Sequence, residues 1–338
     1  MRHLIKIEHL EDGPGNARLL KVGVGKKQLV TPTYFPAVSK KEIRDPDDKF
    51  VELVTASGYP RLLVSAYDYG RTRTSNQRRI IGKLSDYYRR GAITMLDSGV
   101  FESFWREDPR WGFSNYRRSV KNVDSDLFLS FDVLRVGSAS ADEFRKQTIK
   151  CIGDSIELTD GSHCIPIIHG KNPSELLAFA TGLMRKIPQK VSNLAVSERE
   201  LGQSISERCT TVAKIRKVLN NGSGGLLHIL GCGHPLSMAC YVYCGADMFD
   251  SLDWAVSAFD PFEDTLTETS HLELLDCKCE VCSNSKIDSS SRVYLHNLLS
   301  YQEFTMKLHS MIRQKTLADY IQEEAGKAFH GKLAKLFS

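Results

Sequence analysis

The feature that most constrains the fold is a regular alternation between short apolar runs and longer helix-like stretches. Each apolar run is short and rich in β-branched side chains, which is typical of a buried strand. The runs occupy residues 33–38, 61–65, 92–96, 127–131, 165–168, 193–196, 226–230 and 246–249. Helix-like stretches at 76–90, 139–158, 173–186, 206–219 and 235–244 separate them. Such alternation predicts parallel βα units.

Five residues with chemical or conformational roles stand directly after, or at the end of, different predicted strands. They are Asp97, Asp132, His169, Gly231 and Asp250. A (β/α)8 barrel collects such residues from many strand ends on one face, whereas an open parallel sheet concentrates them at one switch point. We therefore predict an α/β fold of the (β/α)8 TIM barrel type. An N-terminal β-hairpin, with turns around residues 12–15 and 23–25, precedes the first barrel strand.

A second motif, Cys277-x-Cys279-x-x-Cys282, is followed by His296 fourteen residues later. Three thiolates and an imidazole can complete a tetrahedral sphere around Zn²⁺, and such a closed sphere predicts one structural zinc ion per chain. His309 is the alternative fourth ligand. The competing interpretation is buried or disulfide-bonded cysteines. The chain has nine cysteines, an odd number, and its start has no apolar signal-peptide core, so we predict a reducing, cytoplasmic setting.

The metal motif suggests how the chain is divided. We assign residues 1–270 to the catalytic barrel with its N-terminal hairpin, and residues 271–338 to an inserted zinc-binding subdomain with C-terminal helices. The serine-rich stretch 283–291 is predicted to be a loop. The amphipathic tail 316–338, which ends in basic residues, is predicted to pack on the barrel.

Composition narrows the partners. With 41% hydrophobic and 25% charged residues, and no run approaching the roughly 20 apolar residues of a membrane span, we expect no membrane association. The net charge is only +4, so nucleic-acid binding depends on local clusters. Arginines interleaved with aromatic residues form two such clusters. The alternative interpretation is that each cluster is a solvated helix face whose aromatic side chains pack inward. Their arginines are Arg71, Arg73, Arg78 and Arg79 in the first, and Arg106, Arg110, Arg117 and Arg118 in the second.

Six segments, one of which is the zinc motif, occur in the order seen in tRNA-guanine transglycosylases. This chain resembles that family from about Thr31 to its C-terminus. The six are Leu96-Asp97-Ser98-Gly99-Val100-Phe101, Ser130-Phe131-Asp132, Leu194-Ala195-Val196, Gly231-x-Gly233-x-Pro235, Gly245-Ala246-Asp247-Met248-Phe249-Asp250 and Cys277-x-Cys279-x-x-Cys282 with His296. The resemblance implies a (β/α)8 barrel with a zinc subdomain that exchanges guanine in nucleic acid for a 7-deazaguanine.

The resemblance also implies roles for individual residues. Asp250 is the expected nucleophile, forming a covalent aspartyl-sugar intermediate, and Asp97 is the expected general acid/base. Asp132 is expected to accept hydrogen bonds from the edge of the guanine-like base. Phe101 is expected to stack on it. The remaining base-pocket residues implied by the family are Ser98, His169, Gly170, Leu194, Ala195 and Gly231.

Three departures from the family pattern bear on the substrate. His169-Gly170 replaces a Gln-Gly pair, and Val100 replaces a glycine. After Asp250 the chain reads Ser251-Leu252-Asp253-Trp254, where bacterial tRNA enzymes carry an arginine segment that helps hold the anticodon loop. This loss favours the DNA-acting branch of the family, which inserts a base such as preQ0 into DNA.

Other interpretations remain open. The first keeps the chemistry and changes the polymer to tRNA. The second is a noncatalytic scaffold subunit, and the retained pair Asp97 and Asp250 argues against it. The third, a metallohydrolase, requires an open metal coordination position, which four protein ligands do not leave. A homodimer or partner proteins are compatible with the family, although the sequence identifies no interface.

Overall fold

Nine parallel strands form the centre of the molecule in a computed structural model that describes residues 5–39, 49–70, 75–133, 140–159, 163–186, 192–220 and 224–337. Each strand lies within a few residues of a predicted run. The strands are β4 (Thr33–Val38), β5 (Arg61–Ser65), β6 (Ile93–Asp97), β7 (Leu127–Leu129), β8 (Cys164–Ile165), β9 (Ile167–Ile168), β10 (Leu194–Ser197), β11 (Leu227–Leu230) and β12 (Met248–Ser251).

This sheet closes into a barrel. The strand order is β8-β7-β6-β5-β4-β12-β11-β10-β9, so β8 and β9 are its two edges. Only Pro166 separates these two strands in the chain. Proline has no N–H to donate to a ladder, so the strand is interrupted there. The Pro166 carbonyl still accepts a hydrogen bond from Ala195 N at 2.8 Å. Counted as one strand, β8 and β9 make an eight-stranded barrel, as predicted.

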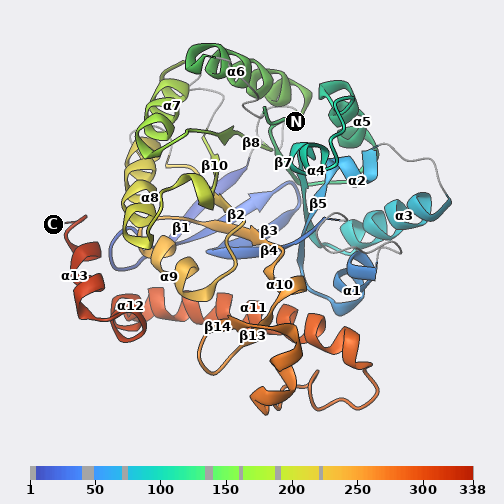
Figure 1. Ribbon diagram of the computed structural model, residues 1–338, viewed down its shortest axis with the longest axis vertical. Coiled ribbons are helices and arrows are strands. Elements are labelled where there is room, and N and C mark those ends of the chain that lie inside the picture. The colour runs from blue at the N-terminus through green and yellow to red at the C-terminus, as the bar shows by residue number, and fades with distance from the viewer. Residues whose placement is uncertain are drawn as a thin grey trace.

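Helices surround the barrel (Figure 1). They are α1 (Lys49–Ser57), α2 (Ala66–Gly70), α3 (Ser75–Arg89), α4 (Val100–Trp105), α5 (Phe113–Asn122), α6 (Ala141–Leu158), α7 (Pro173–Lys186), α8 (Ile205–Asn220), α9 (Pro235–Tyr243) and α10 (Asp253–Val256). The predicted helix 173–186 matches α7 at both ends. The predicted helix 139–158 begins at Ala141, because the Ser140 hydroxyl accepts a hydrogen bond from Glu143 N and caps α6. Ala139 lies outside the described residues.

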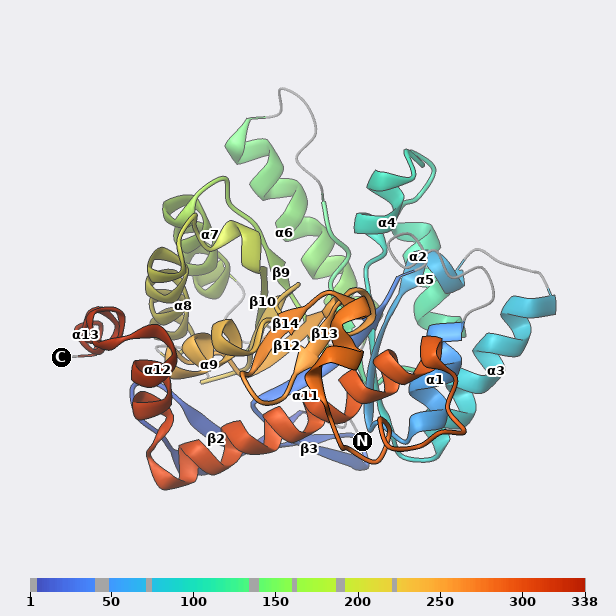
Figure 2. The ribbon, with the colours of Figure 1, turned by 60° about the horizontal axis from the view of Figure 1, so that its bottom comes forward.

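An antiparallel sheet covers the end of the barrel where the strands begin. It consists of β1 (Lys6–Asp12), β2 (Arg18–Val24) and β3 (Lys27–Thr31), so the predicted hairpin is extended by a third strand. Leu20, Val22 and Leu29 from this sheet join one buried cluster with residues of the barrel strands. Figure 2 shows β2 and β3 on the opposite side of the barrel from α4 and α6. The small sheet therefore closes one end and leaves the other for a site.

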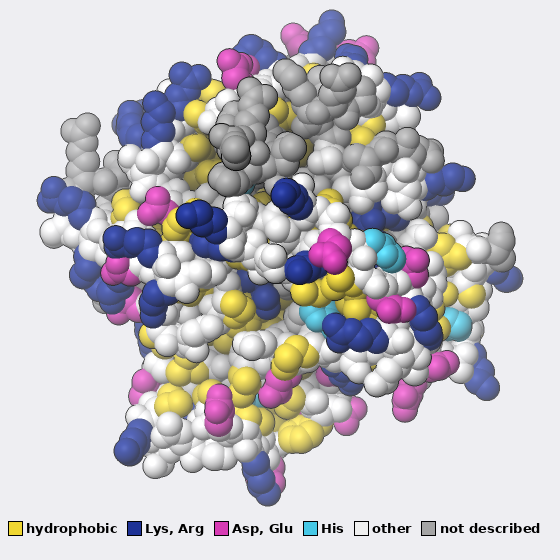
Figure 3. Space-filling model, turned by 180° about the vertical axis from the view of Figure 1, so that it is seen from behind, with side chains coloured by type: hydrophobic (Ala, Val, Ile, Leu, Met, Phe, Trp, Pro, Cys, Tyr) yellow, Lys and Arg dark blue, Asp and Glu magenta, His cyan; other side chains and the backbone are white. Residues whose placement is uncertain are grey.

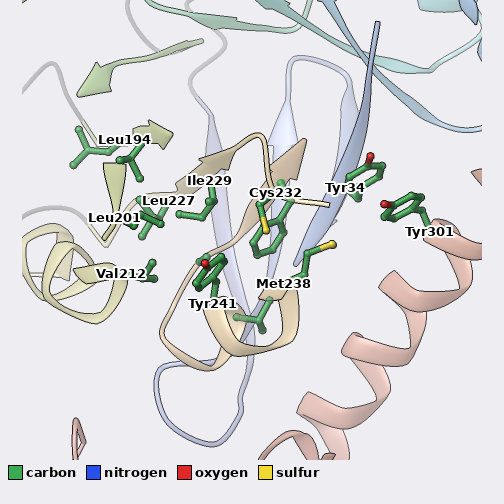
Figure 4. Packing of buried hydrophobic residues seen from close by; sticks show 14 of the residues in the cluster. Tyr34, Leu194, Leu201, Val212, Leu227, Ile229, Cys232, Met238, Tyr241 and Tyr301 are labelled. Atoms are coloured by element: carbon green, nitrogen blue, oxygen red, sulfur yellow. The ribbon is translucent and has the colours of Figure 1, made fainter. Parts of the chain in front are cut away.

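The chain after β12 packs along the barrel. It contains β13 (Ala258–Asp260), β14 (Thr265–Thr267), a 3-10 helix (Thr269–Leu275), α11 (Ser289–Gln314), α12 (Leu317–Ala325) and α13 (Lys327–Ala334). Tyr301 of α11 stacks on Tyr34 of β4 with ring centroids 4.0 Å apart, and Figure 4 shows these rings facing each other beside the buried residues of β10, β11 and α9. Helix α12 contacts α9 and α13 contacts α8, which confirms the predicted packing of the tail.

Two smaller expectations have different outcomes. The predicted loop 283–291 is wrong for its last three residues, because Asp288 accepts a hydrogen bond from Ser291 N and α11 therefore begins at Ser289. The division at residue 270 stays a prediction. Among the described residues, no helix has the length and apolar character that crossing a membrane requires. On the face opposite to Figure 1, basic and acidic side chains lie interspersed (Figure 3).

Candidate active site and metal centre

A cavity of about 410 Å³ opens at the carboxyl ends of the barrel strands. It collects seven of the predicted site residues from five different strand ends: Asp97, Ser98, Phe101, Asp132, His169, Gly231 and Asp250. The other three predicted pocket residues do not line it. Gly170 follows His169, and its N–H donates to Glu200 Oε2 at 3.0 Å. Leu194 and Ala195 are fully buried in β10.

Asp250, on β12, reaches the cavity with one carboxylate oxygen already occupied. Its Oδ1 lies 2.7 Å from Nε2 of His228, a fully buried residue on the neighbouring strand β11. The other ring nitrogen of His228 has no hydrogen-bond partner among the described residues. The geometry thus fits a neutral imidazole that donates through Nε2. The sequence analysis missed this residue, whose signal was a single histidine within the apolar run 226–230.

Asp97, at the end of β6, is held by backbone rather than by a cation. Gly99 N donates to its Oδ2 at 3.2 Å. Burial, with added repulsion from Asp250 and Asp132, raises the pKa of Asp97 to about 7. The turn depends on Gly99, which has φ 74° and would place a Cβ 2.4 Å from Tyr67 N. A carboxyl group with this pKa can both donate and accept a proton near neutrality.

Glu102 is a second carboxyl group that the sequence analysis missed. It lies on α4, is only 4% exposed and lines the cavity. Its Oε2 has no hydrogen-bond partner among the described residues. Burial, together with the charges of Asp97 and Asp68, raises the pKa of Glu102 to about 8. The site therefore holds two neighbouring carboxyl groups that resist ionisation.

Asp132 and His169, which line the cavity, form a chain of three hydrogen-bonded side chains with Glu200. His169 Nε2 lies 2.5 Å from Asp132 Oδ1, and His169 Nδ1 lies 2.8 Å from Glu200 Oε1. Burial alone would lower the pKa of His169, but the two carboxylates raise it to about 10. Burial alone would raise the pKa of Asp132, but the charge and hydrogen bond of His169 lower it below its usual value. The sequence analysis did not find Glu200, which lies three residues beyond the end of β10.

The metal-binding motif forms a separate centre outside the barrel. The ligand atoms of Cys277, Cys279, Cys282 and His296 all lie within 4.8 Å of one another. His296 Nδ1 is 3.5 Å from the sulfurs of Cys279 and Cys282 and 3.7 Å from that of Cys277. Metal–sulfur bonds of about 2.3 Å and metal–nitrogen bonds of about 2.1 Å in a tetrahedron give a sulfur–nitrogen separation of roughly 3.6 Å. The group therefore fits one tetrahedral ion.

The histidine of this group is oriented by a backbone carbonyl. His296 Nε2 lies 2.8 Å from the Phe259 carbonyl, which fixes the proton on Nε2 and leaves the Nδ1 lone pair facing the sulfurs. His309 lies elsewhere, with its Nε2 2.7 Å from the Pro32 carbonyl. The structure therefore brings together the predicted set with His296.

Comparison with known proteins places the chain in a family. A family described as queuine tRNA-ribosyltransferase matches residues 12–329. The chain belongs to this family. A relative from Archaeoglobus fulgidus, named tRNA-guanine(15) transglycosylase, is 23% identical over 332 residues, which cover 92% of this chain and 67% of the relative. Relatives of the same name from Sulfolobus acidocaldarius and Methanocaldococcus jannaschii are 25% and 24% identical, over 93% and 98% of this chain.

These relatives of the queuine tRNA-ribosyltransferase family are longer proteins. The aligned region covers 65% of the Sulfolobus acidocaldarius relative and 53% of the Methanocaldococcus jannaschii relative. The chain thus spans about half to two thirds of the curated relatives that it matches. What those whole proteins do therefore bears on this chain only as a proposal.

The first predicted arginine–aromatic cluster is only partly accessible to a nucleic acid. Arg71 and Arg73 lie outside the described residues. Arg78 and Arg79 are exposed on α3, and Arg79 hydrogen-bonds to Glu52 and Asn76. Tyr87, by contrast, is buried and donates to the Tyr59 carbonyl. The aromatic part of this cluster thus contributes to packing.

The second cluster is more exposed and lies beside the cavity. Arg106 and Arg110, in the turn between α4 and α5, and Arg117 and Arg118, on α5, are all exposed. Trp111 is buried, with its Nε1 donating to the Ser98 carbonyl at 3.1 Å. Phe104 and Trp105 are 52% and 50% exposed, and Trp105 lies edge-on to the cavity residue Phe101. Exposed rings and guanidinium groups thus adjoin the cavity mouth.

Proposed function

We propose that this chain is a guanine transglycosylase that exchanges a guanine base in a nucleic acid through a covalent intermediate on Asp250. The carrying observation is the cavity of a family barrel that holds Asp250 and Asp97 on separate strand ends. The pair combines a hydrogen-bonded carboxylate with a carboxyl group whose pKa is raised to about 7. Two carboxyl groups with different protonation preferences suit displacement at a sugar carbon.

The first displacement breaks the bond between sugar and guanine. A carboxylate oxygen of Asp250 attacks C1′, and the electron pair of the C1′–N9 bond moves to the base. Asp97, protonated, donates its proton to the departing base. His228 holds Asp250 Oδ1, which leaves the other oxygen available for attack. The oxocarbenium-like charge on the sugar is stabilised by the nearby carboxylates.

The second displacement reverses these bond changes with a different base. Asp97, now ionised, removes the N9 proton of the incoming 7-deazaguanine. That nitrogen attacks C1′, and the ester bond to Asp250 breaks. Asp132 accepts hydrogen bonds from the N–H groups of the base edge, and Phe101 stacks on the ring. Ser98 and Gly231 complete the pocket that both bases occupy in turn.

Zinc is the proposed occupant of the Cys277, Cys279, Cys282 and His296 group. Its role is structural, because four protein ligands leave no position for water or substrate. The ion would tie the segment after β14 to α11, which carries His296 and packs on the barrel. The four residues thus stabilise the fold and take no part in the exchange chemistry.

Transfer RNA is the better supported polymer. The relatives are named for a guanine of tRNA numbered 15. The missing arginine segment was expected to hold an anticodon loop, which lies elsewhere in a tRNA, so its loss does not favour DNA over tRNA. In its place Trp254 is fully buried and donates to the Ala37 carbonyl at 2.8 Å. DNA, with preQ0 as the incoming base, is therefore the second candidate, and base exchange on each polymer decides between the two.

The deciding experiment measures exchange of labelled guanine by the purified protein on tRNA, single-stranded DNA and duplex DNA in parallel. Nucleoside mass spectrometry after incubation with preQ0 then identifies the inserted base. We expect incorporation into tRNA and none with Asp250→Asn. Incorporation into DNA alone would favour the DNA interpretation. A folded protein that exchanges no base on any polymer would contradict the proposed enzyme and favour a scaffold role.

A further inference from the structure

His169 is held between two acidic side chains. Its Nε2 faces Asp132 Oδ1 at 2.5 Å, and its Nδ1 faces Glu200 Oε1 at 2.8 Å. The imidazole and both carboxylates are between 12% and 17% exposed. The second oxygen of Glu200 accepts a hydrogen bond from Gly170 N, so the acid beyond the ring is itself fixed.

This arrangement determines the protonation of the ring. A carboxylate can only accept hydrogen bonds, so both ring nitrogens must donate, and only the imidazolium has two N–H groups. Both N–H groups are then used within the protein. His169 lines the cavity, yet in this arrangement it presents neither a free donor nor a free acceptor to a bound base. It therefore does not replace the glutamine of the family pattern in function.

We infer that His169 is a positioning residue whose positive charge keeps Asp132 ionised and turned so that its Oδ2 faces the base. The inference rests on the proposed base exchange. Asp132 Oδ1 accepts from His169 and, at 2.6 Å, from Val133 N, while Oδ2 has no hydrogen bond among the described residues. Oδ2 is thus the oxygen available to the N–H groups of a guanine-like edge.

The surroundings explain why Asp132 requires this partner. It lines the same cavity as Asp97 and Asp250, and both its partial burial and the charge of Asp97 favour its protonated form. A protonated Asp132 would lose an acceptor that the base edge requires. The other groups around the pair are Glu200 and Arg199 from the 3-10 helix after β10, and Phe144 and Cys151 from α6. Among the residues that the structure describes, His169 is the cation that hydrogen-bonds to Asp132.

The test is His169→Gln, which removes the positive charge and keeps a hydrogen-bond donor. An amide can still donate to Asp132 but cannot neutralise it. We expect the KM for the incoming base to rise at least about tenfold at pH 6, and to rise further as the pH falls. The reason is that Asp132, without the neighbouring positive charge, takes up a proton at a higher pH in the variant than in the unaltered protein. The kcat should stay within about threefold, since the reacting atoms are untouched. In the unaltered protein the KM should change little between pH 6 and 8.

A matched control is His309→Gln, another partly buried histidine, which hydrogen-bonds only to the Pro32 carbonyl and lies outside the cavity. Its KM and pH profile should equal those of the unaltered protein. The inference is overturned if His169→Gln shows the same dependence of KM on pH as the control. A fall in kcat with an unchanged KM would overturn it as well.

A second measurement does not depend on activity. Nitrogen-15 NMR of the histidine rings identifies His169 by the signal lost in His169→Gln. We expect that ring to carry protons on both nitrogens at pH 8, because its pKa is about 10. A neutral ring at pH 8 overturns the inference even if exchange is observed. A doubly protonated ring in a protein without exchange activity would instead contradict the proposed function alone.

Discussion

Two aspartates three residues apart mark opposite ends of the same barrel strand. Asp247 immediately precedes β12, and Asp250 lies near its carboxyl end. Asp247 accepts hydrogen bonds from Arg18 Nε and Nη2, from Arg216 and from Leu227 N, and its side chain is fully buried. Asp250 accepts one from His228 and faces the cavity. The same residue type is thus fully neutralised at one end and largely left free at the other.

The neighbours of the two aspartates follow the same division. Arg18 and Arg216 direct further N–H groups to the carbonyls of Gly224, Gly225 and Gly245, which ties the Asp247 network to the backbone. At the cavity end, burial and the charges of neighbouring carboxylates raise the pKa values of Asp97 and Glu102. Buried charges at one end stabilise the barrel, whereas those at the other end cost stability and supply reactivity.

The largest effect should come from Asp250→Asn. The amide keeps an oxygen for His228 but is not a nucleophile, so base exchange should fall by at least ~10⁴-fold. The melting temperature should change by less than about 2 °C, because the fold loses no packing. The exchange assay and a thermal melt measure both. Asp260→Asn, outside the cavity, is the control, and an active Asp250→Asn protein would refute the nucleophile assignment.

Asp247→Asn should have the opposite profile. It leaves the buried Arg18 and Arg216 without a countercharge, which should lower the free energy of unfolding by about 3–5 kcal/mol. Urea denaturation followed by circular dichroism measures this loss. Exchange per folded molecule should remain within about twofold. If Asp247→Asn were as stable as the unaltered protein, Asp247 would not stabilise the barrel, and the contrast with Asp250 would be wrong.

Cys279→Ser extends the comparison to a third polar cluster. We expect loss of bound zinc, measured by elemental analysis, and a lower yield of folded protein, because a structural metal contributes its binding energy to folding. A loss of about 2 kcal/mol would lower the melting temperature by several degrees. Cys151→Ser, outside this group, is the control. A metal-free Cys279→Ser protein of normal stability would show that this metal centre does not stabilise the fold.

Asp97→Asn should reveal how much stability the buried carboxyl groups at the cavity end of the barrel cost. The folded-state pKa of Asp97, about 7, lies above its usual value of 3.8, so ionisation destabilises the fold as the pH rises from about 4 to about 7. The amide removes this cost and should add up to about 4 kcal/mol of stability at pH 8, and nothing near pH 4. Denaturation at the two pH values measures the difference. A variant that is less stable at pH 8 would contradict the raised pKa.

Much of the barrel was predictable because its signals are local. Apolar runs with β-branched residues predicted the strands, and α7 was located at both ends. The cysteine spacing brought Cys277, Cys279 and Cys282 together because all three lie in one short segment. Glu200 and His228 were missed, since each hydrogen-bonds to a partner from a different βα unit. Glu102 was missed because only the fold shows that it is buried among the charges of Asp97 and Asp68. Their distances depend on how the strands are staggered in the closed barrel.

The sequence by itself determined the βα alternation, the residues at the strand ends and the metal motif, because hydrophobic period and ligand spacing are properties of neighbouring residues. Only the tertiary structure decided the electrostatics. It placed His169 between Asp132 and Glu200, held Asp250 against His228, and neutralised Asp247 with Arg18 and Arg216. Burial and charge partners set how readily a carboxyl group ionises, and both arise when distant segments meet.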